Sequence, residues 1–493
     1  MVAASVSGRP NLGRDTDGMM SINRLLERAT QGEPAVAPIR LLGDGSATVS
    51  DVTNDSNEVR DGAVFCCVRG ERHDGHAFAG EAVRRGAVAL LVDHPLDEVK
   101  VPQIVAGDTR EAMGHLAAAF YDHPSHALAV VGVTGTNGKT TTAHMLGSML
   151  EQSGRKTTVI GTLTGVRTTP EAPELQRTLA TERLAGTQAV VMEVSSHALS
   201  LKRVAGTHFA AAVFTNLGHD HLDFHGSREE YFAAKASLFR RSFTPLAVVN
   251  RDDEYGRRLA GVTDTHVVTY GRDDATEVEV ASSTSTFSWR GTRLRCGVGG
   301  DFNVMNAIAA ATTAAELGVA SDGISAGLAN LPRIPGRFED INPGGDFAVV
   351  VDYAHTPEAL RQVLASARLV ARGRGRVIVV FGCGGDRDSG KRPAMGTAAC
   401  DADRVIVTSD NPRNEDARTI IDSITAGVPA DKRNIVTVEM DRRRAIELGC
   451  REAARGDVVV IAGRGHERFQ EISGRLVPFD DAEVARSVLG VSG

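Results

Sequence analysis

The sequence of 493 residues has few aromatic residues, no excess of positive charge and no long apolar run. A net charge of −7 argues against nucleic-acid binding. No apolar stretch reaches the roughly 18 residues of a membrane span, so we expect no membrane partner. The six cysteines lack the C-x-x-C spacing of metal sites and are interpreted as reduced thiols of a cytoplasmic protein. Residues 1–19 lack the apolar core of a signal peptide and are predicted to be a disordered leader, with Met19 or Met20 as an alternative start.

The rest of the chain divides into three segments, as its length suggests. Residues 20–127 combine short β-rich pieces with Gly-rich turns. Residues 128–332 alternate continuous apolar strands with helices, and residues 333–493 repeat that pattern after a proline-containing linker. Apolar strands without alternation predict parallel sheets that helices cover on both faces. We therefore expect an α/β protein of three domains.

The most specific stretch is VTGTNGKTTT, residues 133–142, which follows an apolar strand. Its glycines allow backbone N–H groups to turn toward phosphate oxygens at the start of a helix. Lys139 would neutralise phosphate charge, and the Thr140 hydroxyl could reach Mg²⁺. The match to G-x-x-x-x-G-K-[ST] is imperfect, because Val133 stands where the first glycine belongs. A plain glycine turn is the alternative, and nucleotide binding is the preferred interpretation.

Two further predicted strand ends carry polar side chains. Glu193 directly follows the apolar run AVVM, where a carboxylate would hold magnesium beside a phosphate loop. The next strand end, TNLGHDHLDFHG, concentrates histidines and aspartates: His219, Asp220, His221, Asp223 and His225. Alone, this cluster could be a surface loop or a transition-metal site. Beside a phosphate loop, His221 is better interpreted as a neutral imidazole that serves a second magnesium, and the aspartates as groups that fix the loop.

The whole set of motifs resembles the Mur ligase family, and within it the UDP-N-acetylmuramoyl-tripeptide synthetases. The resemblance rests on ordered blocks from about residue 50 onward: TGTNGKTTT, TTPEAPELQ, MEVSSHAL, TNLGHDHLDFHG, YFAAKASLF, FNVMNAIAA, IPGRFE, VDYAHTPEAL, FGCGGDRDSGKRP, SDNPR and AGRGHE. It implies a mixed α/β N-terminal domain that binds the UDP-muramoyl group (20–127), a central ATPase-like domain with a doubly wound parallel sheet (128–332) and a Rossmann-like C-terminal domain for the amino acid (333–493).

The resemblance also implies a reaction and its cofactors. ATP, with Mg²⁺, would phosphorylate the terminal carboxylate of UDP-N-acetylmuramoyl-L-alanyl-D-glutamate, and an amino acid's amine would displace phosphate from the acyl phosphate. The implied catalytic residues are Lys139, Glu193, His221 and Lys235. The implied ATP-binding residues are Gly135, Thr136, Asn137, Gly138, Lys139, Thr140, Thr141, Asn303, Asn306, Arg337, Asp352 and His355. The implied metal ligands are Thr140, Glu193, His221 and a carbamylated Lys235.

Further residues match the substrate positions of the family. For the UDP-muramoyl dipeptide these are Ser56, Thr168, Thr169, Ser195 and Arg203. Asn57 stands where the family's uridine-side motif has arginine, and Leu201 where some members have glutamine. For the incoming amino acid the matching residues are Arg387, Asp410, Asn411, Pro412, Arg413, Gly463 and Glu467. SDNPR is the signature of members that add meso-diaminopimelate, whose second carboxylate Arg413 and Arg387 could pair with. Arg464 replaces the lysine usual in AGKGHE.

Three alternatives remain open at this stage. Lys235 lies among alanines in a helical pattern, where a lysine is most often a surface residue; the resemblance instead implies a carbamate. A lysine-adding ligase of the same type or a folylpolyglutamate-synthase-like enzyme would share much of the pattern. A nucleotide-dependent regulatory binder without turnover would keep the fold. We expect a cytoplasmic monomer with small-molecule substrates.

Overall fold

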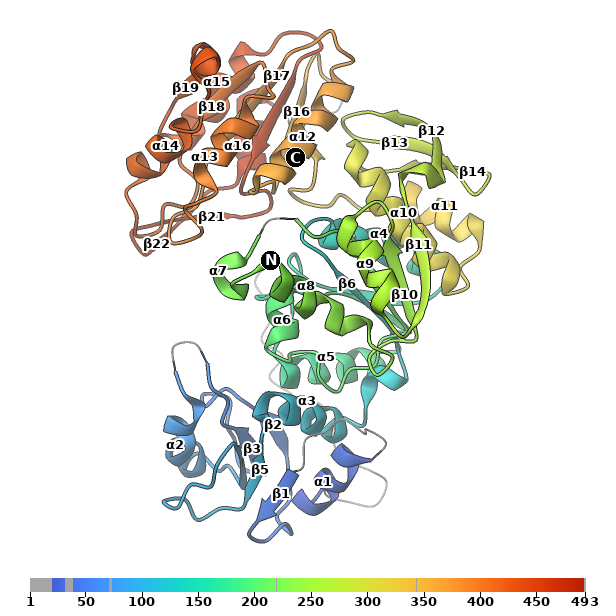
Figure 1. Ribbon diagram of the computed structural model, residues 1–493, viewed down its shortest axis with the longest axis vertical. Coiled ribbons are helices and arrows are strands. Elements are labelled where there is room, and N and C mark those ends of the chain that lie inside the picture. The colour runs from blue at the N-terminus through green and yellow to red at the C-terminus, as the bar shows by residue number, and fades with distance from the viewer. Residues whose placement is uncertain (1–19, 32–38, 71–72, 219, 343, 492–493) are drawn as a thin grey trace.

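The chain forms three regions that follow one another along the long axis of the molecule, in sequence order (Figure 1). The computed structural model describes residues 20–31, 39–70, 73–218, 220–342 and 344–491. The predicted leader, residues 1–19, and His219 of the histidine cluster lie outside the described residues. The predicted fold class is confirmed, whereas the domain limits at 127/128 and 332/333 remain predictions.

The N-terminal region is a mixed sheet with strand order β1-β5-β4-β3-β2, in which β1 is antiparallel and the other neighbours are parallel. Its strands are β1 (Ile39–Leu42), β2 (Asp51–Thr53), β3 (Ala63–Cys66), β4 (Ala89–Val92) and β5 (Gln103–Ala106). Its helices are α1 (Ile22–Thr30), α2 (Ala79–Arg84) and α3 (Thr109–Phe120). Asp108 starts α3 because its carboxylate accepts the N–H groups of Arg110 and Glu111, each at 3.0 Å.

The central region is built on a parallel sheet of order β11-β10-β9-β6-β8-β7. Its strands are β6 (Ala129–Thr134), β7 (Thr157–Ile160), β8 (Ala189–Glu193), β9 (Ala211–Phe214), β10 (Leu246–Asn250) and β11 (His266–Tyr270). Its helices are α4 (Lys139–Gln152), α5 (Ala172–Leu184), α6 (Ser196–Ser200), α7 (Leu222–His225), α8 (Arg228–Ala236), α9 (Glu254–Val262), α10 (Asp301–Glu316) and α11 (Ser321–Ala329). Strands β8 and β9 are buried along their whole length, which explains their uninterrupted apolar sequences.

A small antiparallel sheet, which the apolar-run criterion does not detect, is inserted in the central region. Its strands are β12 (Ala275–Val280), β13 (Ser285–Trp289) and β14 (Thr292–Cys296). In β13 and β14, buried side chains alternate with half-buried or exposed ones, because one face of the sheet packs on α10 and α11 while the other remains accessible to solvent.

The C-terminal region is a sheet of order β15-β16-β20-β17-β18-β19, parallel except for β15. Its strands are β15 (Glu339–Asp340), β16 (Ala348–Asp352), β17 (Val377–Phe381), β18 (Arg404–Val407), β19 (Val436–Val438) and β20 (Val458–Ala462), followed by the hairpin β21 (Phe469–Ile472) and β22 (Arg475–Pro478). Its helices are α12 (Pro357–Val370), α13 (Arg392–Ala399), α14 (Ala417–Thr425), α15 (Arg442–Glu452) and α16 (Asp481–Leu489).

The junction between the N-terminal and central regions is a polar contact between α5 and the first sheet. Arg177 of α5 binds Asp51 of β2 at 3.2 Å, Glu58 at 3.3 Å and the hydroxyl of Tyr121 at 2.9 Å. All six cysteines are buried and unpaired. No helix among the described residues has the length and apolar character needed to cross a bilayer.

Candidate active site

The predicted phosphate loop connects β6 to α4 at the carboxyl end of the central sheet. Gly138, with φ of +88°, precedes α4, and a Cβ there would lie 2.4 Å from Oδ1 of Asn306, so this position requires glycine. Nζ of Lys139 donates to the carbonyl oxygens of Gly135 and Thr136, each at 2.9 Å. The first N–H groups of α4 have no carbonyl partner within the helix and lie at the end where the helix dipole is positive, an arrangement that suits phosphate.

Glu193 ends the neighbouring strand β8 and is buried beside the loop. Its Oε2 accepts the Thr140 hydroxyl at 2.9 Å, and its Oε1 accepts the N–H of Thr162 at 2.8 Å. Arg337, from the linker that leads into the C-terminal region, donates to the Thr140 hydroxyl at 3.1 Å. A carboxylate, a hydroxyl and a guanidinium therefore meet where the sequence predicts the metal and the phosphates.

A cavity of about 240 Å³ opens at this place, between the central and C-terminal regions. It is lined by many of the residues predicted for ATP and substrate: Thr136, Asn137, Gly138, Lys139, Thr140, Thr141, Thr168, Glu193, Ser195, His221, Asn306, Arg337, Asp352 and His355. Gly135 and Asn303 support the lining from behind: Gly135 accepts from Lys139, and Asn303 Oδ1 accepts from Asn306 Nδ2 at 2.9 Å.

The lining also includes side chains that the motifs did not single out. Among them are Thr162, Phe302, Tyr353, Gln362 and Val363. Tyr353 lies inside the quoted block VDYAHTPEAL, between two predicted contacts, and its ring lies 4.7 Å from the Arg337 guanidinium. Position in a motif could have found Tyr353 and also Phe302, which begins the block FNVMNAIAA. Thr162, in the turn after β7, and Gln362 and Val363 of α12 lie outside the motifs and reach the cavity only through packing.

Asp352 holds the linker in place. Burial raises its pKa to about 6, and its two oxygens accept the N–H groups of Phe338 at 2.7 Å and Ala354 at 2.8 Å. The side chain predicted to contact ATP is thus also a structural acceptor that fixes the turn carrying Arg337.

The loop after β9 approaches the C-terminal region. Oδ2 of Asp220 lies 3.4 Å from Nε2 of His221 and 3.8 Å from Nε2 of His355. Burial opposes ionisation of Asp220, but the charges of His355 and His221 hold its pKa below the usual value. Burial lowers the pKa of His221 to about 4, so its imidazole is neutral at pH 7 and can act as a ligand.

Lys235 of α8 is buried, with 1% of its surface exposed, so the surface interpretation of this lysine is wrong. Its Nζ donates to the carbonyl oxygen of Gly135 at 2.8 Å and lies 4.7 Å from the centre of the Tyr231 ring. Burial, followed by the positive charge of Lys139, lowers the pKa of Lys235 well below its usual value. This lowered pKa favours the neutral amine, which is the form that reacts with CO₂.

The residues predicted for the UDP-muramoyl dipeptide fall into two groups. Thr168 and Ser195 line the cavity, and Thr169 joins them from below, since its hydroxyl donates to the Glu193 carbonyl oxygen at 2.9 Å. The Arg203 guanidinium lies 2.8 Å from the Glu171 carboxylate. A substrate carboxylate that binds Arg203 would therefore share this guanidinium with Glu171. Ser56 is in the N-terminal region and is not part of the cavity.

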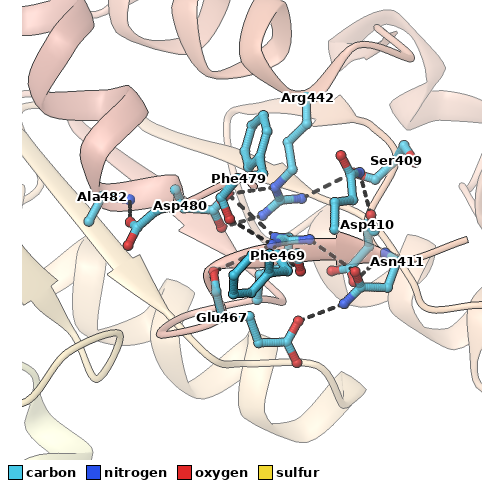
Figure 2. A network of polar contacts seen from close by, with 12 residues as sticks. Ser409, Asp410, Asn411, Arg442, Glu467, Phe469, Phe479, Asp480 and Ala482 are labelled. Atoms are coloured by element: carbon cyan, nitrogen blue, oxygen red, sulfur yellow. Dashed lines mark hydrogen bonds and ion pairs between the residues drawn. The ribbon is translucent and has the colours of Figure 1, made fainter. Parts of the chain in front are cut away.

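The residues predicted for the amino acid follow the strands β17, β18 and β20 of the C-terminal region. Figure 2 shows three of them, Asp410, Asn411 and Glu467, close to one another. Asn411 Nδ2 donates to Glu467 Oε2 at 2.6 Å, and a Cβ on Gly463 would lie 2.5 Å from Asp410 Oδ2. Pro412 follows Asn411 and leads into Arg413.

Arg413 and Arg387 approach the same glycine. A Cβ on Gly384 would lie 3.0 Å from Nη1 of Arg413 and 4.0 Å from Cγ of Arg387. Arg413 has a φ of +51° and pairs with the hairpin: its N–H donates to the Glu471 carbonyl oxygen at 2.9 Å. Its guanidinium lies 3.3 Å from the Glu471 carboxylate, while Arg387 is exposed.

The donors around the phosphate loop fit magnesium. A hydroxyl, a carboxylate and a neutral imidazole from Thr140, Glu193 and His221 line one cavity, and Mg²⁺ prefers few protein ligands completed by water and phosphate. Among the described residues, three close metal-type donors occur only at His76, Asp93 and His94 in the N-terminal region. There the two imidazoles stack, and Arg69 binds the carboxylate at 2.8 Å, so we interpret this group as an ion-pair cluster.

The fold and the cavity define a class of protein: a nucleotide-dependent enzyme in which a phosphate loop on a parallel sheet faces a second α/β region. Comparison with known families identifies the class more closely. Residues 48–121 match the description "Mur ligase family, catalytic domain", residues 133–314 "Mur ligase middle domain" and residues 336–465 "Mur ligase, glutamate ligase domain". The chain belongs to the Mur ligase family, and it is an ATP-dependent ligase, as the sequence predicts.

Similar curated proteins cover almost the whole chain. A UDP-N-acetylmuramoyl-L-alanyl-D-glutamate–2,6-diaminopimelate ligase of Aquifex aeolicus is 42% identical over 466 residues, which are 90% of this chain and 94% of the relative. The ligase of the same name from Streptomyces coelicolor is 43% identical over 475 residues, covering 90% and 93%.

Solved structures agree with this relationship. A structure of a ligase with the same name has a TM-score of 0.66 and 31% identity, covering 96% of this chain and 99% of that one. MurF ligase from Thermotoga maritima, in complex with ADP, has a TM-score of 0.61 at 20% identity, covering 89% and 96%, and is similar in fold alone.

Proposed function

We propose that this chain joins meso-2,6-diaminopimelate to UDP-N-acetylmuramoyl-L-alanyl-D-glutamate in the cytoplasm, during peptidoglycan precursor synthesis. The observation that carries the proposal is the agreement with ligases of this name over 90% of the chain at 42–43% identity. The grouping of Asn411, Arg413 and Glu467 in the C-terminal region supports the choice of amino acid.

The proposed first step is phosphoryl transfer. An oxygen of the dipeptide's terminal carboxylate attacks the γ-phosphorus of ATP, the bond to the β–γ bridging oxygen breaks, and ADP leaves. Lys139 and Arg337 flank the cavity where charge accumulates, and the N–H groups of the loop and α4 would bind the transferring phosphoryl oxygens. Bound Mg²⁺, held by Thr140, Glu193 and His221, would neutralise phosphate charge.

The proposed second step is attack by the amine of the amino acid on the acyl carbon. A tetrahedral intermediate forms and collapses, inorganic phosphate leaves, and the amine loses its proton as the amide appears. No protein nucleophile is needed, because the substrates supply both reacting groups. The chain's contribution is to position them and to exclude water between the central and C-terminal regions.

Lys235 has a separate part in this proposal. The buried neutral amine adds to CO₂, forming an N–C bond and releasing one proton, and becomes an anionic carbamate. This change converts an amine, which would repel magnesium if it took up a proton, into an oxygen ligand of the kind magnesium prefers. The distance of 2.8 Å from Nζ to the Gly135 carbonyl oxygen supports the placement of that carbamate beside the phosphate loop.

The test is phosphate release by the purified chain with ATP, Mg²⁺ and the UDP-muramoyl dipeptide, with either meso-diaminopimelate or L-lysine added. We expect release with diaminopimelate and little with lysine, because lysine lacks the second carboxylate that Arg413 and Arg387 would bind. Equal or better use of lysine would replace this proposal by the lysine-adding ligase.

A further inference from the structure

Arg464, just after β20, is a cation fully buried next to Asn411 and Glu467. Its nearest carboxylate, Asp481, lies 3.8 Å away and is already bound by Arg442 through two contacts of 2.7 Å. Burial, together with the positive charge of Arg442, lowers the pKa of Arg464. A buried guanidinium without a carboxylate of its own is costly, so its position calls for an explanation.

The Arg464 guanidinium bonds to neutral acceptors from three parts of the C-terminal region. It donates to the carbonyl oxygens of Phe469 and Phe479, each at 3.0 Å, and to that of Glu467 at 3.4 Å. It also donates to the side-chain oxygen of Asn411 at 3.1 Å. One planar group thus ties the SDNPR turn to the segment that carries Glu467 and to the hairpin.

These contacts fix which way the Asn411 amide faces. Its Oδ1 accepts from Arg464 and from the N–H of Glu471 at 2.9 Å, so both of its acceptor positions are used. Its Nδ2 must then face Glu467 Oε2, at 2.6 Å. If the Asn411 amide were turned the other way, its NH₂ group would face the two N–H donors of Arg464 and Glu471. An amide cannot change its protonation to remove that conflict, so only the observed orientation is favourable.

We propose that Arg464 is a positioning residue for amino-acid recognition: it fixes Asn411 and Glu467 as a donor and an acceptor that bind the carboxylate and the ammonium of the incoming amino acid. This inference rests on the proposed function. A lysine at this position, with one nitrogen and at most three donors, could not hold all four acceptors.

The experiment is steady-state kinetics of Arg464→Met and Arg464→Lys, with separate KM values for meso-diaminopimelate, ATP and the UDP-muramoyl dipeptide. We expect Arg464→Met to raise the KM for diaminopimelate by about tenfold to a hundredfold, the range for lost bonds to a charged group. The kcat and the other two KM values should stay close to wild type. Arg464→Lys should give a smaller rise. A wild-type KM for diaminopimelate in Arg464→Lys would overturn the inference, and this variant keeps the test decisive if Arg464→Met does not fold.

A double-mutant cycle with Asn411→Ala shows whether Arg464 acts through Asn411. We expect Arg464→Met to add little to the KM for diaminopimelate in the Asn411→Ala background, and full additivity would overturn the inference.

Arg404→Met is the matched control, since Arg404 binds Glu452 at 2.7 Å elsewhere in the same region. The KM of this variant for diaminopimelate should match wild type. A uniform rise of all three KM values in the Arg464 variants would mean a general structural role. A wild-type enzyme that does not use diaminopimelate would instead refute the proposed function.

Discussion

Burial changes the chemistry of two side chains beside the phosphate loop. With its ordinary pKa in water, Lys235 would be a cation, and His221 would be half-protonated near pH 6.5. In the structure both have lowered pKa values, chiefly because Lys235 is fully buried and His221 is partly buried. The motif YFAAKASLF could suggest the identity of the lysine, but only its depth beneath the loop explains why its pKa is lowered toward the neutral amine.

We predict that Lys235→Ala folds and binds ATP but loses most of its ligase activity. The alanine variant cannot form the carbamate that would complete the metal site. The measurement is ¹³C NMR after equilibration with labelled bicarbonate, together with activity in CO₂-depleted buffer. A carbamate resonance should be present in wild type, absent in Lys235→Ala and retained in the exposed-lysine control Lys156→Ala. Full activity in Lys235→Ala without a resonance in wild type would disprove the modification.

The pKa of His221 predicts how stability depends on pH. The unfolded chain binds a proton at His221 near pH 6.5, whereas the folded chain binds it only near pH 4. Between these values His221 therefore destabilises the fold, progressively as the pH falls, and above pH 7 it has no such effect. We expect His221→Gln to lose less Tm than wild type between pH 7.5 and 4.5, by on the order of 1–3 °C, since the side chain is partly exposed. The exposed-histidine control His266→Gln should follow wild type. Identical curves for His221→Gln and wild type would mean that the pKa is not lowered.

At the scale of elements, apolar strands were the most predictable feature. The strands β6, β8, β16, β17 and β20 are buried on both faces, and Val, Ile and Ala accordingly dominate their sequences. The antiparallel strands β12 to β14 and the hairpin β21–β22 were missed, because solvent-accessible strands carry charged residues and lose that signal.

The candidate site was predictable to a similar degree. Residues inside motifs, such as Lys139 and Arg337, could be named, whereas Thr162 and Gln362 enter the cavity only through tertiary packing.

The hairpin β21–β22 positions Arg413, and this position predicts an effect on the choice between diaminopimelate and lysine. The Arg413 backbone pairs with β21, which directs its guanidinium toward Gly384 and Arg387. We expect Arg413→Ala to lower kcat/KM for diaminopimelate by about thirtyfold to a hundredfold, the lower part of the range for a lost buried charge pair, because Arg413 is partly exposed. The measurement is kcat/KM for diaminopimelate and for L-lysine in each variant. Arg418→Ala, which removes an exposed arginine of α14, serves as the control. An unchanged preference in Arg413→Ala would mean that the far carboxylate is bound elsewhere.

At the scale of the whole molecule, the site depends on two regions meeting. Thr140 and Asp220 belong to the central region, and their partners Arg337 and His355 come from the linker and the C-terminal region. The cavity of about 240 Å³ is smaller than the roughly 300–1,000 Å³ of typical ligand pockets. We therefore expect the C-terminal region to move outward when nucleotide enters, and to close again for the reaction.

The most direct test of the central claim is the dependence of ADP formation on the two other substrates. With ATP and Mg²⁺ present, the account predicts one ADP and one phosphate for each amide formed. It also predicts a product whose mass equals that of the UDP-muramoyl dipeptide plus diaminopimelate minus water. Phosphate release should fall to background when either the dipeptide or diaminopimelate is omitted. Steady ATP hydrolysis that ignores both substrates, without a ligated product, would contradict the account.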